Sequence, residues 1–207
     1  MSELMDYDTY IECLKNAIEN KKGVKIMCTT LDRLAGKTPE QLLNEAGVAN
    51  RVPIDLEKLL CYWNVSAMPI DFSKLQKLRD SAEFQQQIQD KGDILGAVVL
   101  EDDNLCIFYK EGDSPNRQRF TIVHELAHCC MDYEQLAKNE INCRYENFSK
   151  TDQHEIAINA FAGKILIPEN PLKLFFEKLL LPTADKLAMI FDVSNTVMAA
   201  RLAYLNL

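Results

Sequence analysis

The sequence predicts an α+β fold, in which a small β-sheet in the middle of the chain is flanked by helices at both ends. Apolar residues at helical spacing mark the first fifty residues and the C-terminal end. Between them, "DILGAVVL", "EDDN" and "LCIFYK" predict a β-hairpin over 93–110, and two strongly apolar helical patterns follow it. With 207 residues, 47% of them hydrophobic, the chain is long enough to bury a substantial core.

The N-terminal region is expected to be helical. Apolar residues between Tyr7 and Ile18 fall on one helical face. A second helix is predicted by "TPEQLLNEAG", where Thr38 is an N-cap, Pro39 suits the first helical position and Gln41 completes a capping box. Gly47 is placed to end this helix.

Three further elements precede the hairpin. Residues 53–63 predict a helix that Asn64 closes in a left-handed conformation. "VSAMPIDF" (65–72) predicts a strand, and Pro69 favours a place at the edge of the sheet because proline donates no ladder hydrogen bond. Residues 73–89 are polar and predict an exposed helix.

The second half of the chain is predicted to be mostly helical. A helix begins at Ser114, as N-cap, with Pro115 at its first position. Residues 132–149 are polar without a clear period and predict a long loop over one side of a site. An apolar helix over 152–168 follows, and two helical patterns at 182–193 and 194–205 complete the chain. We therefore divide the chain into an N-terminal helical segment, a central core and a C-terminal helical segment resembling a helix-turn-helix: 1–50, 51–170 and 171–207.

Composition narrows the function classes. The net charge of −8 argues against nucleic acid as a partner, since phosphate binding needs a cationic surface. No apolar run approaches the roughly 20 residues of a membrane span, and the acidic N-terminus lacks the pattern of a signal peptide. Seven scattered cysteines without a C-x-x-C pair favour reduced thiols. We expect a cytoplasmic protein with no membrane association.

The stretch "RFTIVHELAHCC" carries the chemistry. His124 and His128 lie four residues apart, so a helix offers both imidazoles to one ion. Glu125 lies about 100° round the helix, where it can take a proton from a water bound to that ion. This is the zincin arrangement, and it predicts a zinc site with Glu125 as the general base. The alternative, a chance pattern, would leave three polar side chains in a mostly buried helix.

Catalytic zinc usually takes three protein ligands and a water. The third is expected from the helix after Thr151, where Asp152, His154 and Glu155 are candidates. Glu155 shares a helical face with Asn159, and that face interrupts an apolar stripe. A solvated first-turn glutamate, favoured by the helix dipole, is the alternative explanation, so the residues alone leave this choice open.

The motifs "NRQRFTIVHELAH", "HEIAINAFAGKILIP" and "LAMIFDVSNTVMAARL" resemble those of the ImmA/IrrE family of metallopeptidases. The resemblance covers about 53–207. Ala127, where the family has glycine, and Ile158, where it has alanine, depart from the pattern. By alignment the resemblance makes His124, His128 and Glu155 the zinc ligands and Glu125 the base. It implies a zincin-like core, with a small sheet packed on the motif helix, and a helix-turn-helix repressor as the protein substrate.

Two other functions compete with a zinc endopeptidase. A non-catalytic metal-binding module would hold a regulatory protein partner, but a structural site would not need Glu125. A DNA-binding protein would use the C-terminal helices, yet residues 184–207 carry only Lys186 and Arg201 as cations against two aspartates. For the group that stabilises the oxyanion, His154 and three residues of the polar loop are possible: Tyr133, Arg144 and Tyr145. Cys129 and Cys130 are interpreted as core thiols.

Overall fold

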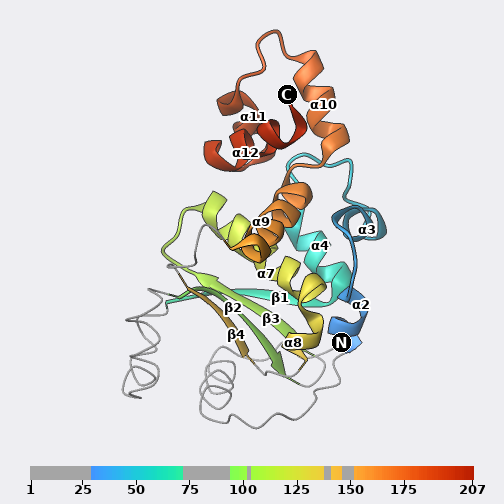
Figure 1. Cartoon of the computed structure of the whole chain (residues 1–207), viewed down its shortest axis with the longest axis vertical. Helices are drawn as coiled ribbons and strands as arrows, with labels where there is room; N and C mark the ends of the chain where they lie inside the picture. Colours follow the sequence, from blue (N-terminus) through green and yellow to red (C-terminus); the bar gives the residue numbers. More distant parts are fainter. Residues whose placement is uncertain (1–28, 72–93, 102–103, 138–140, 146–151) are drawn as a thin grey trace.

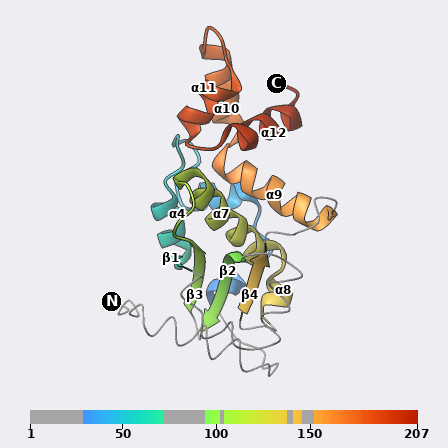
Figure 2. The same cartoon turned by 90° about the vertical axis from the view of Figure 1, so that its left-hand side faces the viewer.

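A four-stranded sheet forms one end of the described molecule, and helices α4, α7 and α9 lie on the same side of it (Figures 1 and 2). The computed structural model describes residues 29–71, 94–101, 104–137, 141–145 and 152–207. The helices predicted around 7–18 and 73–89 lie outside these residues. The strands are β1 (Val65–Ile70), β2 (Ile94–Glu101), β3 (Asn104–Lys110) and β4 (Ile141–Tyr145), in the order β1-β3-β2-β4. The predicted α+β class is confirmed.

Strand pairing follows the expected pattern in its central part. Strands β2 and β3 form the predicted antiparallel hairpin, and β1 pairs with β3 in parallel, with Val65 opposite Leu105. In the described sheet β1 is an edge strand, as Pro69 predicted. The pairing of β2 with β4 has an irregular register between Ile94 and Gly96.

The region 132–149 corrects the prediction of a long loop. It contains α8 (Tyr133–Leu136) and strand β4, which pairs antiparallel with β2 from Val99↔Ile141 to Ile94↔Tyr145. The strand arises because the second side of β2 carries backbone groups that need hydrogen-bond partners. The five residues "INCRY" are too few and too polar to show a period of their own. A helix for which no prediction was made, α10 (Glu169–Lys178), follows later.

The caps predicted for α3 and for the end of α4 are confirmed, whereas α2 was not predicted and α4 begins three residues later than expected. Helix α2 spans Thr29–Leu34, α3 spans Pro39–Glu45 and α4 spans Leu56–Trp63. Thr38 and Gln41 form the capping box of α3, and Gly47 beyond its end has a positive φ of 65°. Asn64 closes α4 in a left-handed conformation, as expected.

The two central helices form the core of the molecule. Helix α7 (Pro115–Met131) packs on β2 and β3, and α9 (Gln153–Leu166) packs on α7. All ten residues from Thr121 to Cys130 are buried, so α7 is enclosed by the sheet on one side and by helices on the other. Ser114 occupies the N-cap position of α7, but its side chain makes no capping hydrogen bond.

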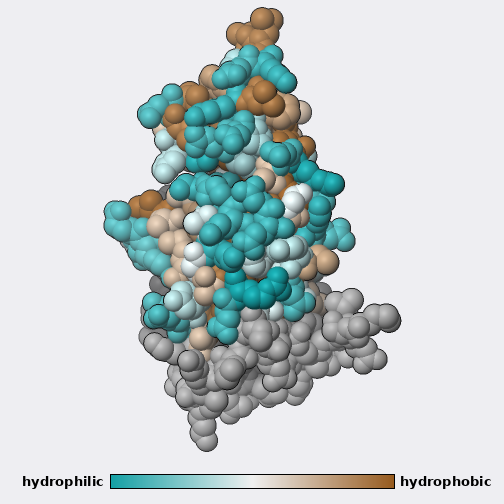
Figure 3. All heavy atoms as spheres, turned by 90° about the vertical axis from the view of Figure 1, so that its right-hand side faces the viewer, coloured by the Kyte–Doolittle hydropathy of each residue, from teal (hydrophilic) through white to brown (hydrophobic). Residues whose placement is uncertain are grey.

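Helices α10, α11 (Ala184–Phe191) and α12 (Asn195–Leu205) form the end opposite the sheet (Figure 2). Val193 and Ser194 lie in the turn between α11 and α12. The exposed large apolar side chains at this end include Leu174, Leu180, Leu181 and Met189. Figure 3 shows hydrophobic surface at the same end. Within the described residues, none of the helices is long and apolar enough to cross a membrane.

Two arginines join the C-terminal helices to the rest of the molecule. Arg119 of α7 donates to the carbonyl oxygens of Ile54 and Asp192, at 3.0 and 3.2 Å. Arg201 of α12 is buried and donates to the carbonyl oxygen of Ile167 at 3.1 Å. One hydrophobic cluster runs through the described residues from Leu31 to Leu202. The division of the chain into the segments 1–50, 51–170 and 171–207 stays a prediction.

Candidate metal centre

Helices α7 and α9 bring three ligand-type side chains together. The Nε2 atoms of His124 and His128 lie 3.1 Å apart, and both face the carboxylate of Glu155. The oxygens of Glu155 lie 3.4 Å from His124 Nε2 and 3.6 Å from His128 Nε2. All three residues are buried, with exposed fractions of 0%, 7% and 6%. The residues that the sequence proposed as ligands therefore converge on one point.

The donor set fits a small divalent ion. Two nitrogens that each bind zinc at about 2.0–2.1 Å in tetrahedral geometry lie roughly 3.3 Å apart, close to the distances observed here. A buried carboxylate with two imidazoles is also the donor set of catalytic zinc sites, which leave a fourth position for water. Without a cation, burying the Glu155 carboxylate costs free energy that only hydrogen bonds or charge pairing offset. The arrangement thus suits a metal ion better than a packing role.

The outer nitrogen of each histidine has a polar partner. His128 Nδ1 lies 2.6 Å from Asp132 Oδ2, and His124 Nδ1 lies 3.0 Å from Asn159 Oδ1. Such partners orient a ligating imidazole and select the tautomer that presents Nε2 to the ion. Asn159 lies on the same face of α9 as Glu155, as the sequence suggested. Sequence reasoning missed Asp132, although its position four residues after His128 is a signal for this contact.

His154 lies beside the site and not inside it. Its side chain is 49% exposed, and its Nε2 atom lies 2.9 Å from the same Asp132 oxygen that holds His128. This hydrogen bond to Asp132 is the main cause that raises the pKa of His154. His128, Asp132 and His154 also form a second group close enough to hold an ion. We interpret His154 as a support for Asp132, because a buried three-ligand group already uses His128 Nε2.

Glu125 lies on the side of α7 that faces the sheet. It is 1% exposed, and it does not belong to the group formed by His124, His128 and Glu155. Its Oε1 atom lies 2.7 Å from the position that a Cβ atom would take at Gly96 in β2, and the Thr121 methyl lies 2.8 Å from it. Any larger residue at 96 would collide with both. Gly96 was not singled out from the sequence, although a glycine within a strand signals a close approach.

Three residues considered for oxyanion stabilisation and the two adjacent cysteines lie on α8, β4 and α7. The Tyr133 hydroxyl lies on α8 and contacts Glu134 at 3.4 Å. Tyr145 and Arg144 lie on β4, and their side chains are outside the described part of the structure. Cys129 and Cys130 are buried, and burial raises the pKa of Cys130 to about 12. Their places agree with the interpretation as core thiols.

A mixed α+β core with two histidines on one helix, met by a glutamate from a second, is the architecture of metal-dependent hydrolases of the zincin type. Residues 82–203 match the family model of Peptidase_M78, the IrrE N-terminal-like domain. Because this match spans more than half of the chain, the chain belongs to that metallopeptidase family. A comparison with curated proteins finds no match. The family match confirms the resemblance stated above.

Proposed function

We propose that the protein is a zinc-dependent endopeptidase, with His124, His128 and Glu155 as the ligands. The observation that carries the proposal is the buried convergence of these three side chains from α7 and α9. Membership in a metallopeptidase family independently supports hydrolysis of a peptide bond. Zinc is favoured over magnesium or calcium because two of the three donors are imidazoles, which those hard cations avoid.

Glu125 is the general base in this proposal. A bound zinc ion supplies a Lewis acid that lowers the pKa of water to about 7 and polarises the scissile carbonyl. The Glu125 carboxylate accepts the proton of the attacking water and passes it to the leaving amine. Gly96 in β2 leaves space for this carboxylate, because a Cβ atom there would lie 2.7 Å from Glu125 Oε1. Asp132 and Asn159 hold the two imidazoles in place.

The substrate that we propose is a helix-turn-helix transcriptional repressor. Support comes from the resemblance to the ImmA/IrrE family, whose members cut such repressors. A polypeptide substrate also agrees with the peptidase family of the chain. The cleavage of a repressor would couple the enzyme to transcription without contact between the enzyme and DNA.

The experiment that tests this function compares the wild type with Glu125→Gln. Candidate repressors, starting with any encoded near this gene, are incubated with purified, zinc-loaded protein, and fragments are identified by mass spectrometry. We expect one zinc per chain in both proteins and at least a 100-fold loss of cleavage in Glu125→Gln, since glutamine accepts no proton from water. Protein that takes up no zinc would contradict the proposal.

The same variant separates the enzyme from a non-catalytic binding module. A module that only holds its partner would lose nothing in Glu125→Gln, because the ligands are unchanged. Repressor bound equally by both proteins and cut by neither would therefore support the module.

A further inference from the structure

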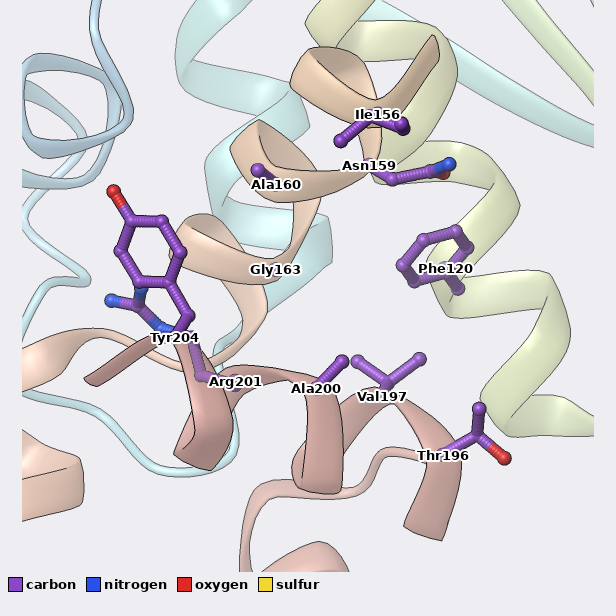
Figure 4. A pocket seen from close by; sticks show the side chains of 10 residues that line it. All are labelled: Phe120, Ile156, Asn159, Ala160, Gly163, Thr196, Val197, Ala200, Arg201 and Tyr204. Carbon is purple, nitrogen blue, oxygen red and sulfur yellow. The ribbon is translucent and has the colours of Figure 1, made fainter. Parts of the chain in front are cut away.

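A groove runs between α9 and α12, beside the candidate metal centre. Figure 4 shows the two helices facing each other, with Phe120 of α7 at one end and Tyr204 at the other. Its volume is about 490 Å³, in the range of ligand-binding pockets. The ten lining residues, which define the α9–α12 groove, are mostly apolar or small: Phe120, Ile156, Asn159, Ala160, Gly163, Thr196, Val197, Ala200, Arg201 and Tyr204.

One end of the groove lies beside the outer nitrogen of His124, on the side that turns away from the candidate metal position. Asn159 lines the groove, and its Oδ1 atom lies 3.0 Å from Nδ1 of the candidate ligand His124. Phe120 lies one helical turn before His124, with the two rings 6.1 Å apart. Ile156, next to Glu155 in the sequence, is an apolar side chain that is 46% exposed. A chain bound in the groove would therefore lie next to residues that surround the centre.

The dimensions of the groove fit a short helix. The lining residues of α9 span Ile156 to Gly163 and those of α12 span Thr196 to Tyr204, which correspond to walls about 10 and 12 Å long. Two turns of an α-helix are about 11 Å long and present three or four apolar side chains on one face. The small side chains of Ala160 and Ala200, and the absence of one at Gly163, leave room in the groove for apolar side chains of a helix that lies along its opening.

Positive charge gathers at the end away from the metal. Lys164 Nζ and the Arg201 guanidinium carbon lie 5.5 and 5.4 Å from the centre of the Tyr204 ring. Glu169 also lies near these two cations, and it is itself paired with Lys173 at 2.6 Å. Glu40 is a second carboxylate near Arg201, so three cations face two carboxylates in a chain of net charge −8. This end suits an acidic side chain on the occupant.

We propose that the α9–α12 groove binds an amphipathic helical segment of the protein substrate, with an acidic residue toward Tyr204, and so delivers the adjoining chain to the metal centre. This inference rests on the proposed function, because that function makes the ligand a polypeptide. It assigns substrate recognition to α9 and α12, the two walls of the groove.

Two neighbouring alanines on α12 provide a matched pair of variants. Ala199 and Ala200 are both exposed, but only Ala200 lines the groove. Ala200→Leu fills the groove, and Ala199→Leu adds the same side chain outside it. Gly163→Leu fills the groove from the opposite wall, where a Cβ atom meets nothing within 4 Å. Equal zinc content and equal circular dichroism spectra show that each variant folds.

The experiment measures binding of a fluorescein-labelled helical peptide to the zinc-loaded full chain by fluorescence anisotropy. All proteins carry Glu125→Gln, so that the probe is not cut. The probe is a lactam-closed peptide of about twelve residues, with leucines at i, i+3, i+4 and i+7 and a glutamate near one end. A second probe replaces the leucines with glutamines.

We expect saturable binding of the leucine probe and at least about 10-fold weaker binding of the glutamine probe. Ala200→Leu and Gly163→Leu should each weaken binding of the leucine probe at least about 10-fold. Ala199→Leu should weaken it less than about 2-fold. Equal affinity of Ala199→Leu and Ala200→Leu, or no binding at all, would overturn the inference.

Cleavage assays then separate this inference from the proposed function. If the probe discriminates between the two alanine variants but no repressor is cut by protein with Glu125, the groove assignment stands and the proposed function fails. If repressor is cut equally fast by Ala199→Leu and Ala200→Leu, the proposed function stands and the groove assignment fails.

Discussion

The two sides of α7 hold their functional side chains in different ways. Toward α9, His124 and His128 meet Glu155, and hydrogen bonds to the side-chain oxygens of Asn159 and Asp132 orient the imidazoles. Toward the sheet, Glu125 lies so close to Gly96 that a Cβ atom added there would be 2.7 Å from its Oε1 atom. The ligand side depends on hydrogen bonds among several side chains, whereas the sheet beside the base leaves no room for a side chain at position 96. Substitutions on the two sides should therefore have separable effects.

The largest expected effect comes from Gly96→Ala. The added methyl would lie 2.7 Å from Glu125 Oε1, so the carboxylate must move. A displacement of about 1 Å at a catalytic group costs roughly 100-fold in turnover, and overpacking costs about 1–3 kcal/mol in the free energy of unfolding. Zinc affinity should stay unchanged. Repressor cleavage and chelator competition measure the two properties. Gly112→Ala is the control, because a Cβ atom added at Gly112 meets nothing within 4 Å. Full turnover by Gly96→Ala would show that the space at Gly96 does not position the base.

On the ligand side, Glu155→Ala should weaken zinc binding by at least about 10-fold, the low end even for supporting residues around a metal. The loss follows from removing the only carboxylate of the buried group. Competition with a zinc chelator measures it. Glu169→Ala, another first-turn glutamate but on the exposed helix α10, is the control and should bind zinc normally. Unchanged affinity in Glu155→Ala would remove this residue from the ligand set.

Asp132→Asn tests the network around the ligands. The amide keeps the shape of the carboxylate but not its charge, so the 2.6 Å contact with His128 Nδ1 weakens. We expect about 10-fold lower zinc affinity, with the same stoichiometry. Asp113→Asn, which affects only a surface pair with Arg117, should leave the affinity unchanged. Equal affinities in the two variants would show that Asp132 does not support the site.

The smallest effect is expected for His154→Ala. Its exposed side chain reaches the centre only through Asp132, and exposed pairs contribute about 0–1 kcal/mol. Zinc affinity should therefore fall by less than about 5-fold. A loss in His154→Ala that exceeds the loss in Glu155→Ala would assign the third ligand to His154.

The features predicted from the sequence are those determined locally. Helix caps such as Thr38 and Asn64, the hairpin, and the i,i+4 histidines depend on residues a few positions apart. Strand β4 was missed because it forms by pairing with the second side of β2, some forty residues earlier in the sequence. The close approach of Gly96 to Glu125 also joins segments that are distant in the sequence, and so does the α9–α12 groove. No local sequence pattern predicts either feature.

The hydrogen bonds of Arg119 bear on how this chain tolerates substitution. Its Nη2 and Nε atoms bind the main-chain oxygens of Ile54 and Asp192, which are present whatever side chains those positions carry. These two hydrogen bonds therefore survive a change of side chain at either acceptor, although Asp192 also pairs with Arg119 through its carboxylate at 3.1 Å and Ile54 is buried in the core. Arg119 itself has no such freedom, because a lysine ammonium cannot reproduce the planar fork that reaches both oxygens at once. Across variants of this protein, the two hydrogen bonds should be lost through changes at the donor and not through changes of side chain at the acceptors.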